Sequence, residues 1–211
     1  MDALVAQVRS LVEDSTVSSL IEERMASFTQ VRDDSDERLF LELCFCLLTA
    51  NFQSEKSMII HDAIGRGFVT HSERALAKRL RSLGYRFPNV RARFIVEARA
   101  HIPFLRSIVY GDELDDSERR AWLATNVKGL GLKEASHYLR NVGIPAFPII
   151  DRHIIAILAE HDLVSDPDVP ITKKRYALIE AVMDALARGT GLDHGRLDFY
   201  VWYLKTGRVL K

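Results

Sequence analysis

The sequence predicts an all-α protein, and three observations lead to this prediction. Apolar residues recur at helical spacing along most of the chain. Period-two alternation and the Asn-Gly or Asp-Gly turns typical of β-hairpins are absent. The chain has 211 residues, of which 47% are hydrophobic and 27% charged, the mixture of an ordinary globular protein. On typical helix lengths, we expect roughly ten helices.

The clearest expected helices carry an apolar stripe in which residues recur every three or four positions. In chain order the stripes are Leu4, Val8, Leu11 and Val12; Leu39, Leu43, Leu47 and Ala50; Ile95, Ala98, Ile102 and Leu105; Leu132, Ala135, Leu139 and Val142; Ile154, Ile157 and Leu158; Tyr176, Ile179, Val182, Met183 and Leu186; and Leu197, Tyr200, Val201 and Leu204. Pro103 should break or kink the third helix, and Gly143 and Gly189 mark the ends of two others. We expect a single domain of two helical lobes with a cleft between them, approximately residues 1–50 plus 145–211, and 51–144.

Composition and charge exclude several classes of protein. The longest apolar run, near residues 39–50, is interrupted by Glu42 and is too short to span a bilayer, and the acidic start does not resemble a signal peptide. Cys44 and Cys46 are the only cysteines, so a disulfide framework and a four-cysteine iron–sulfur cluster are excluded, and both read as buried small hydrophobes. We expect a cytoplasmic protein, associated with the nucleoid, that has no membrane partner.

Basic residues gather in one part of a chain whose formal net charge is +0. Between residues 74 and 106 Glu97 is the only acid, while the basic residues are Arg74, Lys78, Arg79, Arg81, Arg86, Arg91, Arg93, Arg99 and Arg106. The neutral total argues against a protein that coats nucleic acid through bulk charge. One basic face could still follow a row of phosphates, and the alternative is a solvated helix face with local ion pairs.

Residues 128–135 read KGLGLKEA, a Gly-x-Gly turn that leads directly into a helix. Gly129 and Gly131 can adopt positive φ, and successive N–H groups followed by a helix N-terminus form an anion site. A DNA phosphate fits such a turn, and so does a monovalent cation held by the turn's carbonyls and bridging to a phosphate. A short Gly-x-Gly pattern alone is more often a tight interhelical turn.

Lys133 and Asp151 add reactive groups to this turn. Lys133 lies in the first helical turn, where the positive end of the helix dipole disfavours an ammonium, and a neutral amine is a nucleophile. Asp151 opens the next expected helix as an N-cap, and an ionised carboxylate held in that way can stabilise a positive sugar. The alternatives are a surface lysine paired with Glu134 or Asp151, and an aspartate that only caps its helix.

At these positions the chain resembles the helix-hairpin-helix DNA glycosylase superfamily. The family pattern x-x-Gly-x-Gly-x-Lys-x-Ala, with an aspartate at this distance, matches Val127–Ala135 and Asp151; Lys128 departs from the residues often found before the first glycine. Members with a lysine here cut the bond between base and sugar and then nick the strand. The resemblance therefore implies Lys133 as the nucleophile, Asp151 as the stabilising carboxylate, Lys128, Gly129 and Gly131 as contacts to duplex DNA, and a DNA-binding cleft between the lobes.

Most of the chain is similar to one branch of this superfamily, the compact archaeal-type 8-oxoguanine DNA glycosylases. The markers are residues 42–44 and 48–52, 84–87 and 91–93, 133–137 and 140–143, and the ending at residues 202–211. This resemblance implies that Phe87 and Trp202 sandwich the everted base and that Lys211, with its terminal carboxylate, helps to read its edge. Taken alone, these residues also fit a loop hydrophobe, core packing and a frayed terminus.

Two further residues carry weaker predictions. Gln53 lies where such glycosylases fill the gap left by the flipped base, although a polar helix start would look the same. His137 follows Lys133 by one turn and could touch the aspartate or a phosphate, but it also fits a structural histidine. The histidines show no metal-ligand spacing, so we expect no catalytic metal and no cofactor.

The resulting hypothesis is a monomeric base-excision repair enzyme that acts on double-stranded DNA containing an oxidised base. It would remove 8-oxoguanine through a Schiff base on Lys133 and then cleave the strand by β-elimination. The alternatives are a glycosylase for another damaged base and a non-catalytic helix-hairpin-helix module that grips phosphates.

Overall fold

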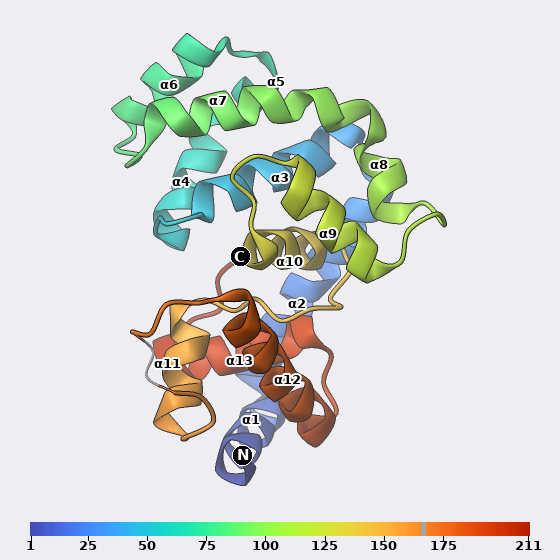
Figure 1. The fold of residues 1–211 in the computed structure, drawn as a ribbon, viewed down its shortest axis with the longest axis vertical. Coiled ribbons are helices and arrows are strands. Elements are labelled where there is room, and N and C mark those ends of the chain that lie inside the picture. The colour runs from blue at the N-terminus through green and yellow to red at the C-terminus, as the bar shows by residue number, and fades with distance from the viewer. Residues whose placement is uncertain (166–167) are drawn as a thin grey trace. The chain divides into compact units, whose positions relative to one another are not determined.

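The computed structural model describes residues 1–165 and 168–211, and these residues form helices joined by turns and short extended segments (Figure 1). They contain thirteen α-helices, two 3₁₀ helices and no strand, which confirms the all-α prediction. The expected number of about ten helices was too low, because pieces such as α5 (Gly67–Thr70) are too short to carry an apolar stripe. Within the same residues, no helix is both long and apolar enough to cross a bilayer.

The chain divides into two compact units. The terminal unit comprises Met1–Ser27 and Pro145–Val209, and the middle unit comprises Phe28–Ile144 together with Leu210–Lys211. The terminal unit holds α1 (Asp2–Glu13), most of α2 (Ser15–Gln30), α11 (Arg152–Glu160), α12 (Lys173–Thr190) and α13 (His194–Thr206). The middle unit holds η1 (Val31–Asp33), α3 (Asp36–Thr49), α4 (Ser54–Ile64), α5, α6 (Glu73–Ser82), α7 (Pro88–Ala98), η2 (Arg99–His101), α8 (Ile102–Tyr110), α9 (Asp116–Asn126) and α10 (Leu132–Asn141).

Residues 28–50, which were expected in one lobe with the chain termini, lie in the middle unit. The reason is the burial of α3, which packs against α4, α8 and α10 and has no exposed residue after Arg38. Ser35 is the N-cap of α3, since its hydroxyl accepts a hydrogen bond from the Arg38 N–H. From Leu39 onward the helix is predominantly apolar around its whole circumference, as expected for a helix at the centre of a core. Cys44 and Cys46 are fully buried, and this burial raises the pKa of both thiols.

The break predicted at Pro103 is present. The chain leaves α7 at Ala98, passes through the 3₁₀ turn η2 and starts α8 at Ile102, so that Pro103 stands in the first turn of a new helix. Proline is tolerated there because the N–H groups of the first turn have no intrahelical acceptor. The stripe from Ile95 to Leu105 therefore belongs to two helices instead of one.

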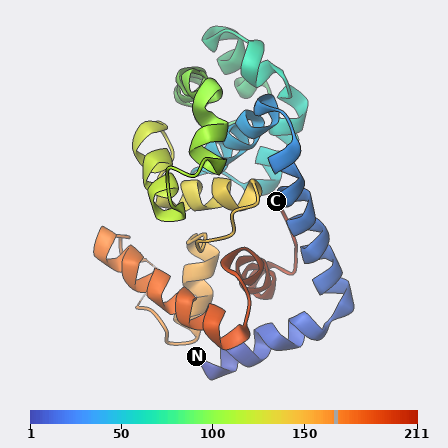
Figure 2. The same cartoon turned by 90° about the vertical axis from the view of Figure 1, so that its right-hand side faces the viewer.

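In the terminal unit, α13 packs against α1, α11 and α12. Figure 2 shows the end of α12 beside α1, where the Arg9 guanidinium donates a 2.7 Å hydrogen bond to the Gly189 carbonyl. The α12 helix continues to Thr190 and stops at Gly191, which has a left-handed φ of 76°. The predicted end near Gly189 was therefore two residues early, because glycine at the following position supplies the left-handed cap.

Candidate active site

A short hairpin joins α9 to α10 in the middle unit. The α9 helix begins with a capping box in which Asp115 and Glu118 each accept the other's backbone N–H. After α9 ends, Leu130 buries its side chain and donates its N–H to the Val127 carbonyl at 3.1 Å. The α10 helix then starts from Gly131 and packs against both α9 and α3. This arrangement is a helix-hairpin-helix motif.

The two glycines of the hairpin serve different purposes. Gly129 has a φ of +90°, and a Cβ atom there would lie 2.6 Å from the Phe94 ring and 3.1 Å from Nη1 of Arg91. Both the backbone conformation and the space therefore require glycine. Gly131 has a φ of −99°, so of the two hairpin glycines only Gly129 adopts the positive φ that glycine permits.

Arg91 supports the hairpin from inside the middle unit, a role that sequence reasoning missed. Its Nε donates to the Tyr85 hydroxyl at 3.0 Å and its Nη2 donates to the Ala50 carbonyl at 3.2 Å. The remaining Nη1 is buried without a hydrogen-bond partner and lies next to Gly129. No signal in the sequence separates this buried arginine from the neighbouring basic residues.

Two more members of the basic segment also make internal contacts. Arg99 donates to the carbonyls of Phe68 and His71, and Arg106 pairs with Asp36 at 2.6 Å. With Arg91, these residues bond to distant segments of the middle unit, Arg91 and Arg99 through hydrogen bonds and Arg106 also through an ion pair, which differs from the predicted alternative of a solvated face with local ion pairs. These three arginines are therefore engaged within the middle unit, and a role of the remaining basic residues in following phosphates stays a prediction.

Lys133 occupies the first turn of α10, and its side chain is 22% exposed. Its Nζ lies 3.8 Å from Oε1 of Glu134, which is beyond hydrogen-bond distance. The other carboxylate oxygen of Glu134 accepts the Gly131 N–H at 3.2 Å, so Glu134 caps the helix start that Gly131 itself cannot cap. Lys133 is thus a partly buried amine beside the hairpin, and its ion-pair partner Glu134 lies beyond hydrogen-bond distance.

The other residues predicted to contact DNA in the middle unit differ in exposure. Lys128 is exposed and pairs with Glu97 at 2.9 Å. Gln53 is exposed at the start of α4, where its side chain makes no cap. Phe87 precedes α7 and is 40% exposed, with the Arg86 guanidinium 4.9 Å from its ring centroid. These side chains are accessible to a ligand, and their contacts with DNA stay predictions.

His137 lies one turn after Lys133, but its side chain is buried. Neither ring nitrogen has a hydrogen-bond partner, and the ring packs edge-on against Phe45 with 5.6 Å between centroids. Burial, and then the charges of Arg140, Lys133 and Lys211, hold the pKa of His137 well below its usual value. A neutral imidazole packed in this way matches the structural histidine that the sequence left open, and a contact with DNA stays a prediction.

Asp151 and Trp202 lie in the terminal unit. One oxygen of Asp151, Oδ1, accepts the backbone N–H groups of His153 at 2.8 Å and Ile154 at 2.9 Å, which confirms that Asp151 is the N-cap of α11. Trp202 on α13 is partly exposed and contacts the edge of the His153 ring at 5.9 Å between centroids. The cap therefore fixes one carboxylate oxygen, while Oδ2 takes no part in capping.

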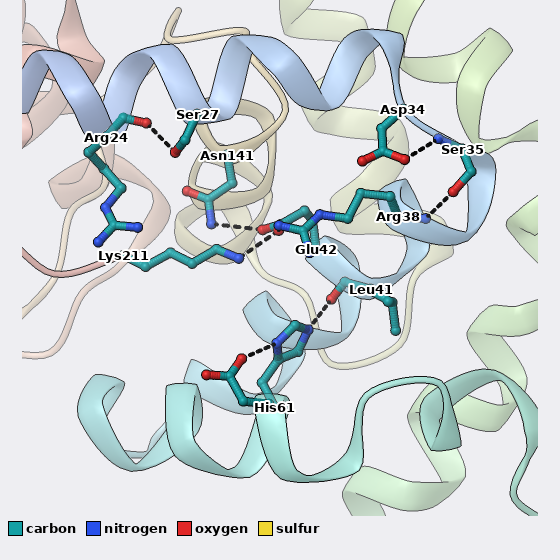
Figure 3. A network of polar contacts seen from close by, with 11 residues as sticks. Arg24, Ser27, Asp34, Ser35, Arg38, Leu41, Glu42, His61, Asn141 and Lys211 are labelled. Atoms are coloured by element: carbon teal, nitrogen blue, oxygen red, sulfur yellow. Dashed lines mark hydrogen bonds and ion pairs between the residues drawn. The ribbon is translucent and has the colours of Figure 1, made fainter.

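Lys211, the last residue, is anchored inside the middle unit (Figure 3). Its Nζ lies 2.6 Å from Oε1 of Glu42 and 4.8 Å from the centroid of the Phe45 ring. The same Phe45 ring packs against His137, so the C-terminal lysine and α10 meet around one aromatic side chain of α3. No role was predicted for Glu42, although it is a charge inside an apolar run and belongs to the marker residues 42–44.

Within the described residues, no three His, Cys, Asp or Glu side chains lie close enough together to hold a metal ion. The groups that could bind a ligand or react are the hairpin backbone, the Lys133 amine, the Asp151 carboxylate, the accessible rings of Phe87 and Trp202, and the anchored C-terminus.

Comparison with known proteins gives one consistent family. Residues 21–192 match the family described as 8-oxoguanine DNA glycosylase. The chain is 46% identical over 211 residues to the 8-oxoguanine DNA glycosylase/AP lyase of Korarchaeum cryptofilum, covering 100% of this chain and 99% of the relative. It is 38% identical over 208 residues to the protein of that name from Methanocaldococcus jannaschii, covering 99% of each chain.

Solved structures agree with the sequence relatives. A crystal structure of the Methanocaldococcus jannaschii 8-oxoguanine glycosylase/lyase, in complex with a 15mer DNA containing 8-oxoguanine, has a TM-score of 0.93 at 37% identity and covers 99% of this chain and 100% of that one. The 8-oxoguanine DNA glycosylase of Thermotoga maritima has a TM-score of 0.91 at 36% identity, with 100% of both chains covered. The chain therefore belongs to the 8-oxoguanine DNA glycosylase family and has its helix-hairpin-helix fold.

Proposed function

We propose that this protein is a bifunctional DNA glycosylase and AP lyase that removes 8-oxoguanine from duplex DNA. The observation that carries the proposal is Lys133, a partly buried amine in the first turn of α10, directly after the hairpin. A lysine whose task was a surface ion pair would have a close partner, whereas the carboxylate of the adjacent Glu134 is 3.8 Å away and caps Gly131. Membership of the family supports the same role.

The proposed chemistry uses the amine as a nucleophile. The neutral Nζ of Lys133 attacks C1′ of the damaged nucleotide, the bond from C1′ to the base breaks, and the base leaves with the bonding electrons. The Asp151 carboxylate stabilises the positive charge that develops on the sugar. Loss of a proton from nitrogen and opening of the C1′–O4′ bond give a Schiff base between Lys133 and the sugar. Removal of a C2′ proton then expels the 3′ phosphate and cleaves the strand.

The remaining predicted residues would bind the substrate. The hairpin from Lys128 to Gly131 binds a phosphate of the duplex through its N–H groups, with a bridging monovalent cation as an added element. Phe87 and Trp202 stack on the everted base, and Lys211 reads its edge, while Gln53 fills the gap left in the duplex and His137 supports the nearby DNA contacts. The proposal assigns no catalytic metal and no organic cofactor, and it expects a monomer that works on chromosomal DNA in the nucleoid.

A panel of duplexes, each containing one damaged or mismatched base, tests the substrate. We expect the highest single-turnover rate of base release from the 8-oxoguanine duplex, together with a strand nick. Faster release of an oxidised pyrimidine or of mismatched thymine would assign a different substrate. If the protein bound every duplex but released no base from any of them, the alternative of a non-catalytic DNA-binding module would be supported instead.

A further inference from the structure

Glu42 is a buried charge that the proposed chemistry does not use. Its side chain is 1% exposed and lies in the middle of α3, between the apolar residues Leu39 and Leu43. A carboxylate is almost never buried to this extent unless cationic partners and hydrogen bonds compensate for the lost water. The buried carboxylate of Glu42 must therefore have compensating partners in the folded protein.

Three side chains converge on this carboxylate (Figure 3). Oε1 receives the Lys211 ammonium at 2.6 Å and the Arg38 guanidinium at 3.2 Å, while Oε2 lies 3.5 Å from Nδ2 of Asn141 on α10. Arg38 precedes Glu42 by one helical turn and is 44% exposed, so water screens its attraction. The Lys211 side chain is 13% exposed and makes the closer contact, so it is the principal partner.

The ion pair between Lys205 and Glu160 shows by contrast why the buried pair between Lys211 and Glu42 is unusual. Lys205 and Glu160 pair in the terminal unit, but both side chains are substantially exposed, and such surface pairs contribute little to stability. Lys211 is a chain terminus, which normally frays, yet its ammonium is held by a buried carboxylate and also faces the Phe45 ring. Without Lys211, the buried Glu42 carboxylate would keep only the half-exposed Arg38 and the more distant Asn141 amide as partners, so the pair with Lys211 opposes fraying.

We propose that Glu42 is the positioning residue of the C-terminus and fixes where the terminal residue stands when the damaged base is read. This inference rests on the proposed function, because it assumes that Lys211 contacts the base. With the ammonium held by Glu42, the main-chain N–H and the terminal carboxylate are the groups of Lys211 that remain for a ligand. Glu42 thus acts through Lys211 and makes no contact with the substrate itself.

The first test measures the anchor without any use of catalysis. Carboxypeptidase B, which removes C-terminal lysine, is added to the native protein, and the loss of one lysine is followed by mass spectrometry. We expect Glu42→Gln to release Lys211 about tenfold faster or more, since a lost charge-assisted hydrogen bond is worth at least one such factor. Glu37→Gln on the same helix is the matched control, because Glu37 pairs with Arg66 at 2.8 Å, and it should release lysine at the wild-type rate.

The second test asks whether the anchor serves base reading. Glu42→Gln, Lys211→Met and the double variant are compared for release of 8-oxoguanine and for nicking of a duplex that contains a preformed abasic site. If Glu42 acts through Lys211, all three variants lose base release to the same degree and keep abasic-site nicking, because that substrate has no base to read. Retained nicking also shows that the variants are folded.

The outcomes separate the two proposals. Release of lysine from Glu42→Gln at the wild-type rate would overturn the anchoring role, whatever the enzyme does. Faster release with unchanged removal of 8-oxoguanine, or additive losses in the double variant, would overturn its link to base reading. A wild-type protein that releases no base would refute the proposed function and leave the carboxypeptidase result to decide on the anchor.

Discussion

The starts of α10 and α11 show two ways in which this chain places a charged side chain at a helix N-terminus. At α11 the first charged group is Asp151, which caps the helix with two backbone hydrogen bonds and is fixed by them. At α10 the cap is a glycine, and the carboxylate of Glu134 reaches back to its N–H. Lys133 therefore takes no part in capping α10, whereas Asp151 caps α11 and also has a proposed chemical role.

This difference suits the proposed division of labour. A carboxylate that stabilises a developing positive charge gains from a fixed position, because a preorganised group needs no reorganisation during the reaction. An amine that must attack, form a Schiff base and then release the sugar has to move with its substrate. The partial burial of Lys133 and its distance of 3.8 Å from Glu134 are consistent with that freedom.

The largest effect should come from removing the free amine. Lys133→Gln should abolish base release and strand cleavage, with a loss on the order of 10⁴-fold or more, as for other catalytic nucleophiles. Binding to a lesion-containing duplex should persist, and band-shift titration measures it. Lys128→Gln is the matched control at the same hairpin; it should weaken binding of the duplex but leave the nucleophile in place, so strand cleavage should persist at saturating enzyme. Strand cleavage by Lys133→Gln at the wild-type rate would show that Lys133 is not the nucleophile.

The next effect should come from neutralising the fixed carboxylate. Asp151→Asn should reduce base release by roughly 10²- to 10³-fold, the usual cost of losing one stabilising charge or dipole. Thermal stability should change little, because asparagine also caps helices well. Asp193→Asn is the control, since Asp193 caps α13 by accepting the Arg196 N–H at 2.8 Å. If both substitutions had the same effect on base release, Asp151 would be only a cap.

A smaller effect, on stability and DNA affinity, should come from a substitution in the hairpin that precedes Lys133. Gly129→Ala combines a left-handed φ with a contact of 2.6 Å to Phe94, and we expect a loss of about 1–3 kcal/mol in unfolding free energy. Affinity for duplex DNA should also fall, because the N–H groups of the turn would move. Gly191→Ala shares a positive φ but has open space around its Cβ, so it isolates the clash. Urea unfolding and duplex titration of both variants would show whether the crowding at Gly129 matters.

The smallest effect concerns the contribution of His137 to the pH dependence of folding stability. The pKa of His137 in the folded protein lies well below 6.5, mainly because of burial, so the unfolded chain takes up this proton first as the pH falls. The corresponding stability is present above pH 6.5 and is lost as the pH falls below it. His137→Leu should therefore show a shallower fall in melting temperature from pH 6.5 towards pH 4.5 than the wild type. Identical slopes would contradict the burial of a neutral imidazole.

Much of the fold could be predicted because local signals and tertiary packing agree. The stripe around Leu132 and Leu139, the break at Pro103 and the cap at Asp151 each have a local physical cause, and the structure contains all three. The place of residues 28–50 could not be predicted in this way. A helix that is apolar on all sides is buried, but its sequence does not say among which partners.

The site shows the same limit. The position of Lys133 in the first turn of α10 was predictable because the helix starts directly after the Gly-x-Gly turn, and the need for glycine at position 129 because the turn needs a left-handed residue. The anchoring of Lys211 by Glu42 joins residues separated by 169 positions, and the support of the hairpin by Arg91 joins it to Ala50, 41 positions away. Such pairings depend on the packing of α3, which no single segment encodes.

The most direct measurement is covalent trapping followed by mapping of the adduct. The protein is incubated with a duplex containing 8-oxoguanine in the presence of sodium borohydride, which reduces a Schiff base to a stable amine, and the cross-linked peptide is sequenced by mass spectrometry. We predict one adduct, on Nζ of Lys133, and none in Lys133→Gln. A duplex that is cleaved without any adduct, or an adduct on another amine, would contradict the assignment of Lys133 as the nucleophile.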